Sequence, residues 1–174
     1  MATVATLTRA PQTACVCTYR CYGRGVPTDH DTAAWAGVLR THAAVVPQLE
    51  RALAQIGLPL TWYDVLLVLN SAPGRMLTMS ELGRQAVVSR ERVSRVVTEL
   101  VREGLVERLA NPDDGRSSYA AITRAGRRRL RAAAPIYLAA VDEHFLQHLS
   151  PREADTIARA LGKVIVQEDA NGLG

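Results

Sequence analysis

The chain has 174 residues, of which 48% are hydrophobic and 22% charged, with a formal net charge of +4. This length and composition suit one core-forming domain with short extensions and exclude a wholly disordered chain, while the charge mildly indicates a polyanionic partner. Because no apolar run approaches the ~18 residues of a membrane span and no signal-peptide pattern opens the chain, we expect a soluble, cytoplasmic protein without membrane contact.

Residues 1–30 show no apolar periodicity, since Thr, Gly, Pro and Cys interrupt each other throughout, and we expect a mobile arm there. The three cysteines of the chain lie in this arm, at Cys15, Cys17 and Cys21. Three thiols this close together make no framework for a secreted disulfide-bonded fold. The alternatives for this arm are a thiol-based redox sensor, a three-thiolate metal site or an inert tail.

Apolar residues at three- and four-residue steps predict an amphipathic helix over residues 31–57, with a kink at Pro47. A second helix is predicted over residues 62–70, with Thr61 as its N-cap. This second helix is apolar nearly all round, which predicts a buried position at the centre of the fold.

Two short helices follow, in a pattern typical of a helix-turn-helix. The first spans residues 80–86, and the second runs from residue 90 to residue 103 with Ser89 as its N-cap. Gly83 lets the two helices cross closely, although Val87 stands where the turn commonly has a glycine. In such a motif the second helix presents its outer face to the major groove of DNA.

A β-hairpin is predicted directly after this motif. Residues 105–110 alternate and predict a strand, the following Asn-Pro-Asp-Asp-Gly segment is a strong turn signal, and residues 117–122 are predicted to form the returning strand. A hairpin in this position makes the motif a winged helix-turn-helix, so the predicted fold is mainly α with a small β-wing.

Two further helices complete the predicted fold. Thr123 caps a long helix in which Pro135 predicts a bend, and Ser150 with Glu153 forms a capping box that opens the last helix. The first and last helices carry wide apolar stripes, yet the winged domain separates them in the chain. They cannot cover each other fully, so we expect a homodimer.

The middle of the chain is its basic part. Residues 75–131 hold 13 of the 21 basic residues but only 7 of the 17 acidic ones. A basic segment between slightly acidic ends predicts a nucleic-acid-binding module, although a solvated helix surface would show the same charge.

Four segments together resemble the MarR (multiple-antibiotic-resistance regulator) family of transcription factors. They are WYDVLLVL, LTMSELGRQAVVSRERVSRVVTELVREGLVER, DDGR and ITRAGRRRL. The wing's Asp-x-Arg signature falls on Asp114 and Arg116, and the Leu-Thr-x-x-Gly signature falls on Ile122, Thr123 and Gly126. The resemblance implies an obligate homodimer with interlocked terminal helices.

This resemblance also implies a domain organisation. Residues 31–168 would form the MarR-type domain, between the arm of residues 1–30 and a tail of residues 169–174. Within this domain, dimerisation helices at about 31–57 and 124–168 would flank a DNA-binding winged helix-turn-helix at about 61–123.

The predicted recognition helix presents a polar face to DNA and an apolar face to the core. The residues predicted to contact DNA are Ser89, Arg90, Glu91, Ser94, Arg95, Thr98 and, in the wing, Arg116. Those predicted to face inward are Val93, Val97, Leu100 and Val101. Arg95 is the best candidate for a base or adjacent phosphate contact. The family pattern inserts Arg116 into the minor groove, and the Asp114 carboxylate is expected to orient Arg116 or to brace the hairpin.

A cluster of aromatic and polar residues is the predicted effector site, for a small aromatic or anionic ligand. Its members are Trp35, His42, Trp62, Tyr63 and Asp64. The same residues would also suit a core or a dimer interface. We therefore expect a ligand-responsive repressor of a palindromic operator in double-stranded DNA, associated with the nucleoid. The alternatives are a constitutive DNA-binding protein without effector and a thiol-based redox-sensing regulator.

The sequence gives no indication of an enzyme, a cofactor or a metal centre. It holds no glycine-rich phosphate loop, nucleophile elbow or paired acid/base motif. His144 and His148 have the i, i+4 spacing of helical metal ligands, but no third ligand is evident, so an ordinary helix face is the favoured interpretation.

Overall fold

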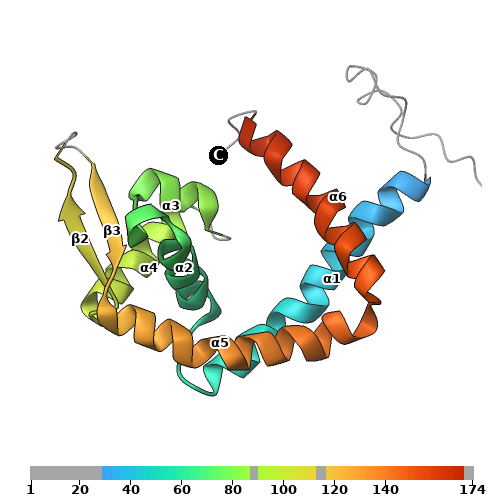
Figure 1. Cartoon of the computed structure of the whole chain (residues 1–174), viewed down its shortest axis with the longest axis horizontal. Helices are drawn as coiled ribbons and strands as arrows, with labels where there is room; N and C mark the ends of the chain where they lie inside the picture. The colour runs from blue at the N-terminus through green and yellow to red at the C-terminus, as the bar shows by residue number, and fades with distance from the viewer. Residues whose placement is uncertain (1–28, 87–89, 113–116, 171–174) are drawn as a thin grey trace, which may run out of the picture. The chain divides into compact units, whose positions relative to one another are not determined.

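A computed structural model of the chain describes residues 29–86, 90–112 and 117–170 (Figure 1). The chain divides into two units, residues 1–42 and 43–174. The elements are α1 (Asp29–Ala54), α2 (Leu60–Ser71), η1 (Pro73–Arg75), β1 (Met76–Thr78), α3 (Met79–Gln85), α4 (Arg90–Arg102), β2 (Val106–Ala110), β3 (Ser118–Ile122), α5 (Arg124–His144), η2 (Leu146–His148) and α6 (Pro151–Ala170). None of the helices in these ranges is both long and apolar enough to span a membrane.

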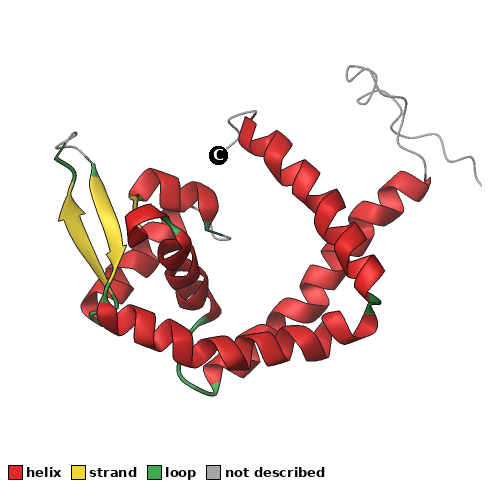
Figure 2. Ribbon diagram, viewed as in Figure 1, coloured by secondary structure: helices red, strands yellow, loops and turns green. Residues whose placement is uncertain are grey.

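Helices dominate the described chain, and the strands form one small antiparallel sheet (Figure 2). The strand order is β1-β3-β2, with β2 and β3 as the predicted hairpin. The sequence did not indicate β1, whose Leu77 pairs with Ala120 of β3. This strand has only three residues, which are too few to show an alternating pattern. It forms because its backbone pairs with β3.

Helix α2 lies at the centre of the core, as predicted. Val65, Leu66 and Leu69 on this helix are completely buried. They belong to one apolar cluster that also takes in Leu100 from α4 and Leu130 from α5. The recognition helix and the start of α5 are therefore both anchored on the same central helix.

Two of the predicted helix N-caps, Thr123 and Ser150, are confirmed. The Ser150–Glu153 capping box is present at the start of α6, where the Glu153 carboxylate accepts hydrogen bonds from the Ser150 backbone N–H at 2.8 Å and hydroxyl at 2.7 Å. Helix α3 has a second capping box, between Thr78 and Glu81, that the sequence analysis missed. The predicted Thr61 cap is wrong, because α2 begins at Leu60, two residues before the predicted start, and its N-cap is Pro59.

The two internal prolines do not end their helices, since α1 contains Pro47 and α5 contains Pro135. Helix α5 ends at His144, and His148 lies in the separate 3₁₀ turn η2. The two histidines therefore do not share one α-helical face. No group of three or more metal-ligating side chains occurs among the residues that the structure describes.

Candidate nucleic-acid interface

Helix α4 has one buried face and one exposed polar face. Val93, Val96, Val97 and Leu100 are at most 4% exposed, whereas Glu91, Arg92, Ser94, Arg95 and Thr98 are exposed. The inward position predicted for Val101 is wrong, because this residue is 37% exposed. The exposed arginines of α4 thus include Arg92 and Arg95, of which the sequence analysis singled out only the second.

Strand β2 adds a further cation to this face. Nη2 of Arg108 donates a hydrogen bond to the Thr98 hydroxyl at 3.3 Å, and that hydroxyl donates to the Ser94 backbone carbonyl at 2.9 Å. The hydroxyl proton of Thr98 is therefore engaged within the protein. Arg108 was not predicted, because its contact depends on a register that brings β2 beside α4.

Glu99 ties α4 to the central helix. The indole N–H of Trp62 donates a hydrogen bond of 3.0 Å to Glu99 Oε2 in a partly buried position. A hydrogen bond to a charged acceptor is among the stronger ones in proteins. This bond explains why a carboxylate stands on a helix whose outer face carries arginines, and it fixes α4 against α2.

A side-chain hydrogen bond closes the wing at the loop end of its two strands. Asn111 Nδ2 donates a hydrogen bond of 2.7 Å to Ser117 Oγ, next to the β2–β3 pair Ala110 and Ser118. The predicted wing residues Asp114 and Arg116 lie outside the described residues. The predicted cap Ser89, the side chain of Arg90 and the three cysteines also lie outside them.

The start of α5 is locked onto the wing base by a threonine and a glycine. The Thr123 hydroxyl donates to the Gly104 carbonyl oxygen at 2.8 Å and accepts from the Gly126 N–H at 3.0 Å. A Cβ atom on Gly126 would lie 2.2 Å from the Leu105 carbonyl oxygen, so only glycine fits there. The Thr-x-x-Gly signature thus couples the end of α4, the wing and α5.

The residues predicted as an effector site differ in burial: Tyr63 lies in the core and Trp62 packs against it, Asp64 is half-buried, and Trp35 and His42 are exposed. Tyr63 is 4% exposed, and its ring stacks on Tyr137 with 4.4 Å between the ring centroids. Burial raises the pKa of both phenols, and the charge of Asp64 raises the pKa of Tyr137 further. Trp35, which is 63% exposed, and His42 belong to the other unit.

The arginines at the start of α5 have separate roles. Arg129 donates hydrogen bonds to the backbone carbonyls of Ile56 and Gly57, where the chain leaves α1. This side chain therefore serves the fold. Arg127 is half-buried, whereas Arg128 is exposed on a solvated part of the helix.

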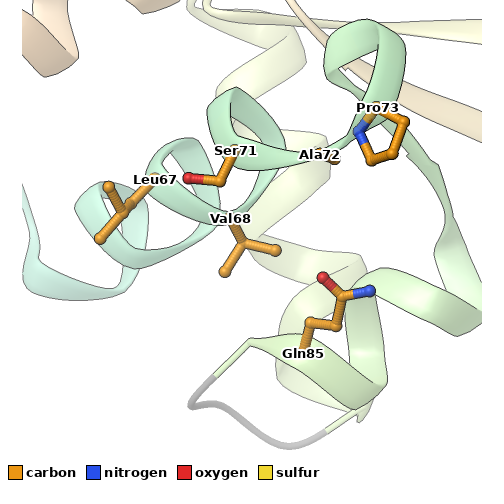
Figure 3. A pocket seen from close by; sticks show the side chains of 6 residues that line it. All are labelled: Leu67, Val68, Ser71, Ala72, Pro73 and Gln85. Carbon is orange, nitrogen blue, oxygen red and sulfur yellow. The ribbon is translucent and has the colours of Figure 1, made fainter.

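A shallow pocket of about 280 Å³ lies between α2 and the end of α3 (Figure 3). Its lining is Leu67, Val68, Ser71, Ala72, Pro73 and Gln85. In the close-up, Gln85 rises from α3 toward the side chains of α2. The volume falls below the usual range for ligand pockets, and the lining carries no charge.

A central helix, a recognition helix with a polar outer face and a β-wing define a winged helix-turn-helix DNA-binding protein. The MarR family model matches residues 56–117. The chain is 32% identical over 125 residues to the HTH-type transcriptional repressor Rv2887 of Mycobacterium tuberculosis, covering 72% of this chain and 88% of that protein. The chain belongs to the MarR family and is an HTH-type transcriptional repressor, not an enzyme.

Solved structures share the fold. The MarR-family regulator Sco3205 of Streptomyces coelicolor, determined in complex with DNA, matches with a TM-score of 0.71 and 28% identity over 84% of this chain and 91% of that chain. BpsR of Bordetella bronchiseptica matches with a TM-score of 0.68 and 18% identity over 80% and 97% of the two chains. Its structure addresses regulation of DNA binding by 6-hydroxynicotinic acid.

Proposed function

We propose that the chain acts in the cytoplasm, on the nucleoid, as a homodimer that binds a palindromic operator through α4 and the wing. The observation that carries this proposal is the two-faced structure of α4. Val93, Val96, Val97 and Leu100 on its apolar side are buried, while Arg92, Ser94 and Arg95 are exposed on the other side. Arginine pairs with guanine in the major groove through two hydrogen bonds, which makes Arg95 the proposed base-reading residue.

The exposed apolar residues of α6 support a dimer. Leu161, Val164, Ile165 and Val166 are between 40% and 69% exposed. Contiguous apolar surface of this kind is typical of an interface, and a second copy of the chain would cover it. Two-fold symmetry then places two copies of α4 in successive major grooves, about 10 base pairs apart between half-site centres.

A small aromatic or anionic effector would release this dimer from DNA. BpsR, which has the same fold, supports this part of the proposal through its regulation by 6-hydroxynicotinic acid. An effector needs only a few kcal/mol of differential affinity for two dimer conformations to empty an operator. A constitutive DNA-binding protein would stay bound to its operator at every concentration of such ligands. Operator release by a ligand therefore distinguishes a ligand-responsive repressor from a constitutive DNA-binding protein.

Selection of bound sites from random DNA, with the full chain, tests the operator. The expected result is an imperfect palindrome with half-sites about 10 base pairs apart. Enrichment of single, non-repeated sites, or of none, would contradict the proposal.

Sedimentation of two α6 variants tests the dimer. Ile165→Glu should shift the protein to monomer, while Lys163→Glu, an exposed position on the same helix, should leave the dimer intact. A dimer that survives Ile165→Glu would refute the assignment of this interface.

A further inference from the structure

The outer face of the wing sheet carries an open pocket of about 530 Å³ between the strands, η1 and the start of α5. Alternation along the strands puts Leu77, Val106 and Ala120 into the core. The neighbouring residues Met76, Leu109 and Ala121 therefore face the other way and line the pocket. Its volume lies within the usual range for small-molecule sites.

Besides these apolar residues, three charged side chains line the pocket, namely Arg75, Arg127 and Glu107. Within the described part of the chain, neither arginine makes a side-chain hydrogen bond or an ion pair, whereas the nearby Arg129 is held by backbone carbonyls. The lining thus has a net charge of +1 and two guanidinium groups available to an anion. The pocket between α2 and α3 offers no such charge.

The backbone of Arg75 is strained. Its φ is +59°, in the left-handed region, which costs a residue other than glycine about 1–2 kcal/mol. The adjacent Gly74, with φ +63°, adopts the same region without that cost. Strained residues of this kind occur preferentially at ligand sites, where the surrounding structure holds them in place.

We propose that this pocket binds a small organic monoanion with a flat apolar body. The anionic group pairs with Arg75 and Arg127, and the body lies over Met76, Leu109 and Ala121. A hydroxyl or N–H group on the ligand donates to the Glu107 carboxylate. The site is distinct from the aromatic cluster around Trp62. Binding requires neither DNA nor a dimer, so the proposal stands apart from operator recognition.

Calorimetric titration of the full chain with 2-naphthoate, and with the neutral 2-naphthamide as a matched ligand, tests this site. The wild-type protein should bind the anion at least tenfold more tightly than the amide. Glu107→Gln should tighten naphthoate binding, because it removes the like charge. The double variant Arg75→Gln/Arg127→Gln should bind both ligands equally weakly.

Arg128→Gln is the control, since it removes one exposed arginine from the same helix outside the pocket lining. It should leave naphthoate affinity within twofold of the wild type. If the double variant fails to fold, Leu109→Glu at a position 40% exposed replaces it and should cost at least tenfold in affinity. Equal binding of naphthoate by wild type and pocket variants, or an equal loss in Arg128→Gln, would overturn the proposal.

Discussion

A methyl group at Gly126 would collide with the backbone that carries the wing. In Gly126→Ala the new Cβ would lie 2.2 Å from the Leu105 carbonyl oxygen and 2.8 Å from Cγ1 of Ile122, where ordinary contacts are 3.4–4 Å. The start of α5 and Leu105 must then separate by about 1 Å. This shift stretches the hydrogen bonds from the Thr123 hydroxyl and backbone N–H to the wing base.

The expected cost combines overpacking with weakened hydrogen bonds. Overpacking typically costs about 1–3 kcal/mol, and each hydrogen bond contributes about 1 kcal/mol. We therefore expect Gly126→Ala to lower the free energy of unfolding by about 3 kcal/mol, which corresponds to a fall in Tm of roughly 6–12 °C for a chain of this size.

Gly162→Ala in α6 is the matched control, because nothing lies within 4 Å of its added Cβ. Alanine in a helix should stabilise the protein by about 0.5–1 kcal/mol relative to glycine. Urea unfolding followed by circular dichroism, at one protein concentration, measures both variants. If Gly126→Ala unfolds at the same urea concentration as the wild type, the close packing of α5 on the wing base is wrong.

Three further predictions concern the recognition helix, the capping box of α3 and the wing. Trp62→Phe should cost about 1–2 kcal/mol of stability, because it removes the donor to Glu99. A double-mutant cycle with Glu99→Leu should show a coupling energy above about 0.5 kcal/mol. A coupling energy near zero would contradict the Trp62–Glu99 hydrogen bond. Thr78 lowers the pKa of Glu81 in the folded state, so this contribution to stability is present above pH 4.5, the ordinary pKa, and is lost as pH falls through the folded value. Glu81→Gln should therefore reduce the loss of stability on acidification, measured by urea unfolding from pH 6 to about pH 3; an unchanged pH profile would refute the assignment. Arg116→Ala should weaken operator binding most where the flanking minor groove is narrow, and Asp114→Ala should act less strongly in the same direction; equal effects on A-tract and G·C-rich flanks in operator titrations would contradict this.

The sequence predicts the order of the helices and the wing hairpin because these depend on local patterns. Apolar periodicity marks the α4 helix, and the Asn-Pro-Asp-Asp-Gly turn marks the hairpin. It does not predict β1, where three residues become a strand only through pairing with β3, 43 positions away between Leu77 and Ala120. It also misplaces the start of α2, since Thr61 is a good N-cap by type but the preceding Pro59 takes that position.

The exposed polar face of α4 is also predictable from a local pattern. The hydrogen bonds that hold α4 in place are not, because they join residues far apart in the sequence. The three- and four-residue spacing of the buried residues along α4 predicts that Arg95 is exposed. Of the four residues predicted to face inward, only Val101, at the edge of the buried face, is exposed. The Trp62–Glu99 bond joins residues 37 positions apart, and the Arg108–Thr98 contact depends on sheet register. Trp62 and Tyr63 illustrate the limit most clearly, because their composition suits a pocket or a core equally well. In the structure they make core and interhelical contacts.

The central claim is that α4 reads DNA through Arg95. Titration of the selected operator with wild type, Arg95→Ala and Arg152→Ala tests it most directly, since both variants remove one exposed arginine and Arg152 lies at the start of α6. Arg95→Ala should lose about 1–3 kcal/mol of binding free energy per subunit and relax the preference at one base of each half-site, while Arg152→Ala should bind almost as tightly as the wild type. Equal operator affinity for Arg95→Ala and the wild type, with the dimer intact, would show that a different surface reads the DNA.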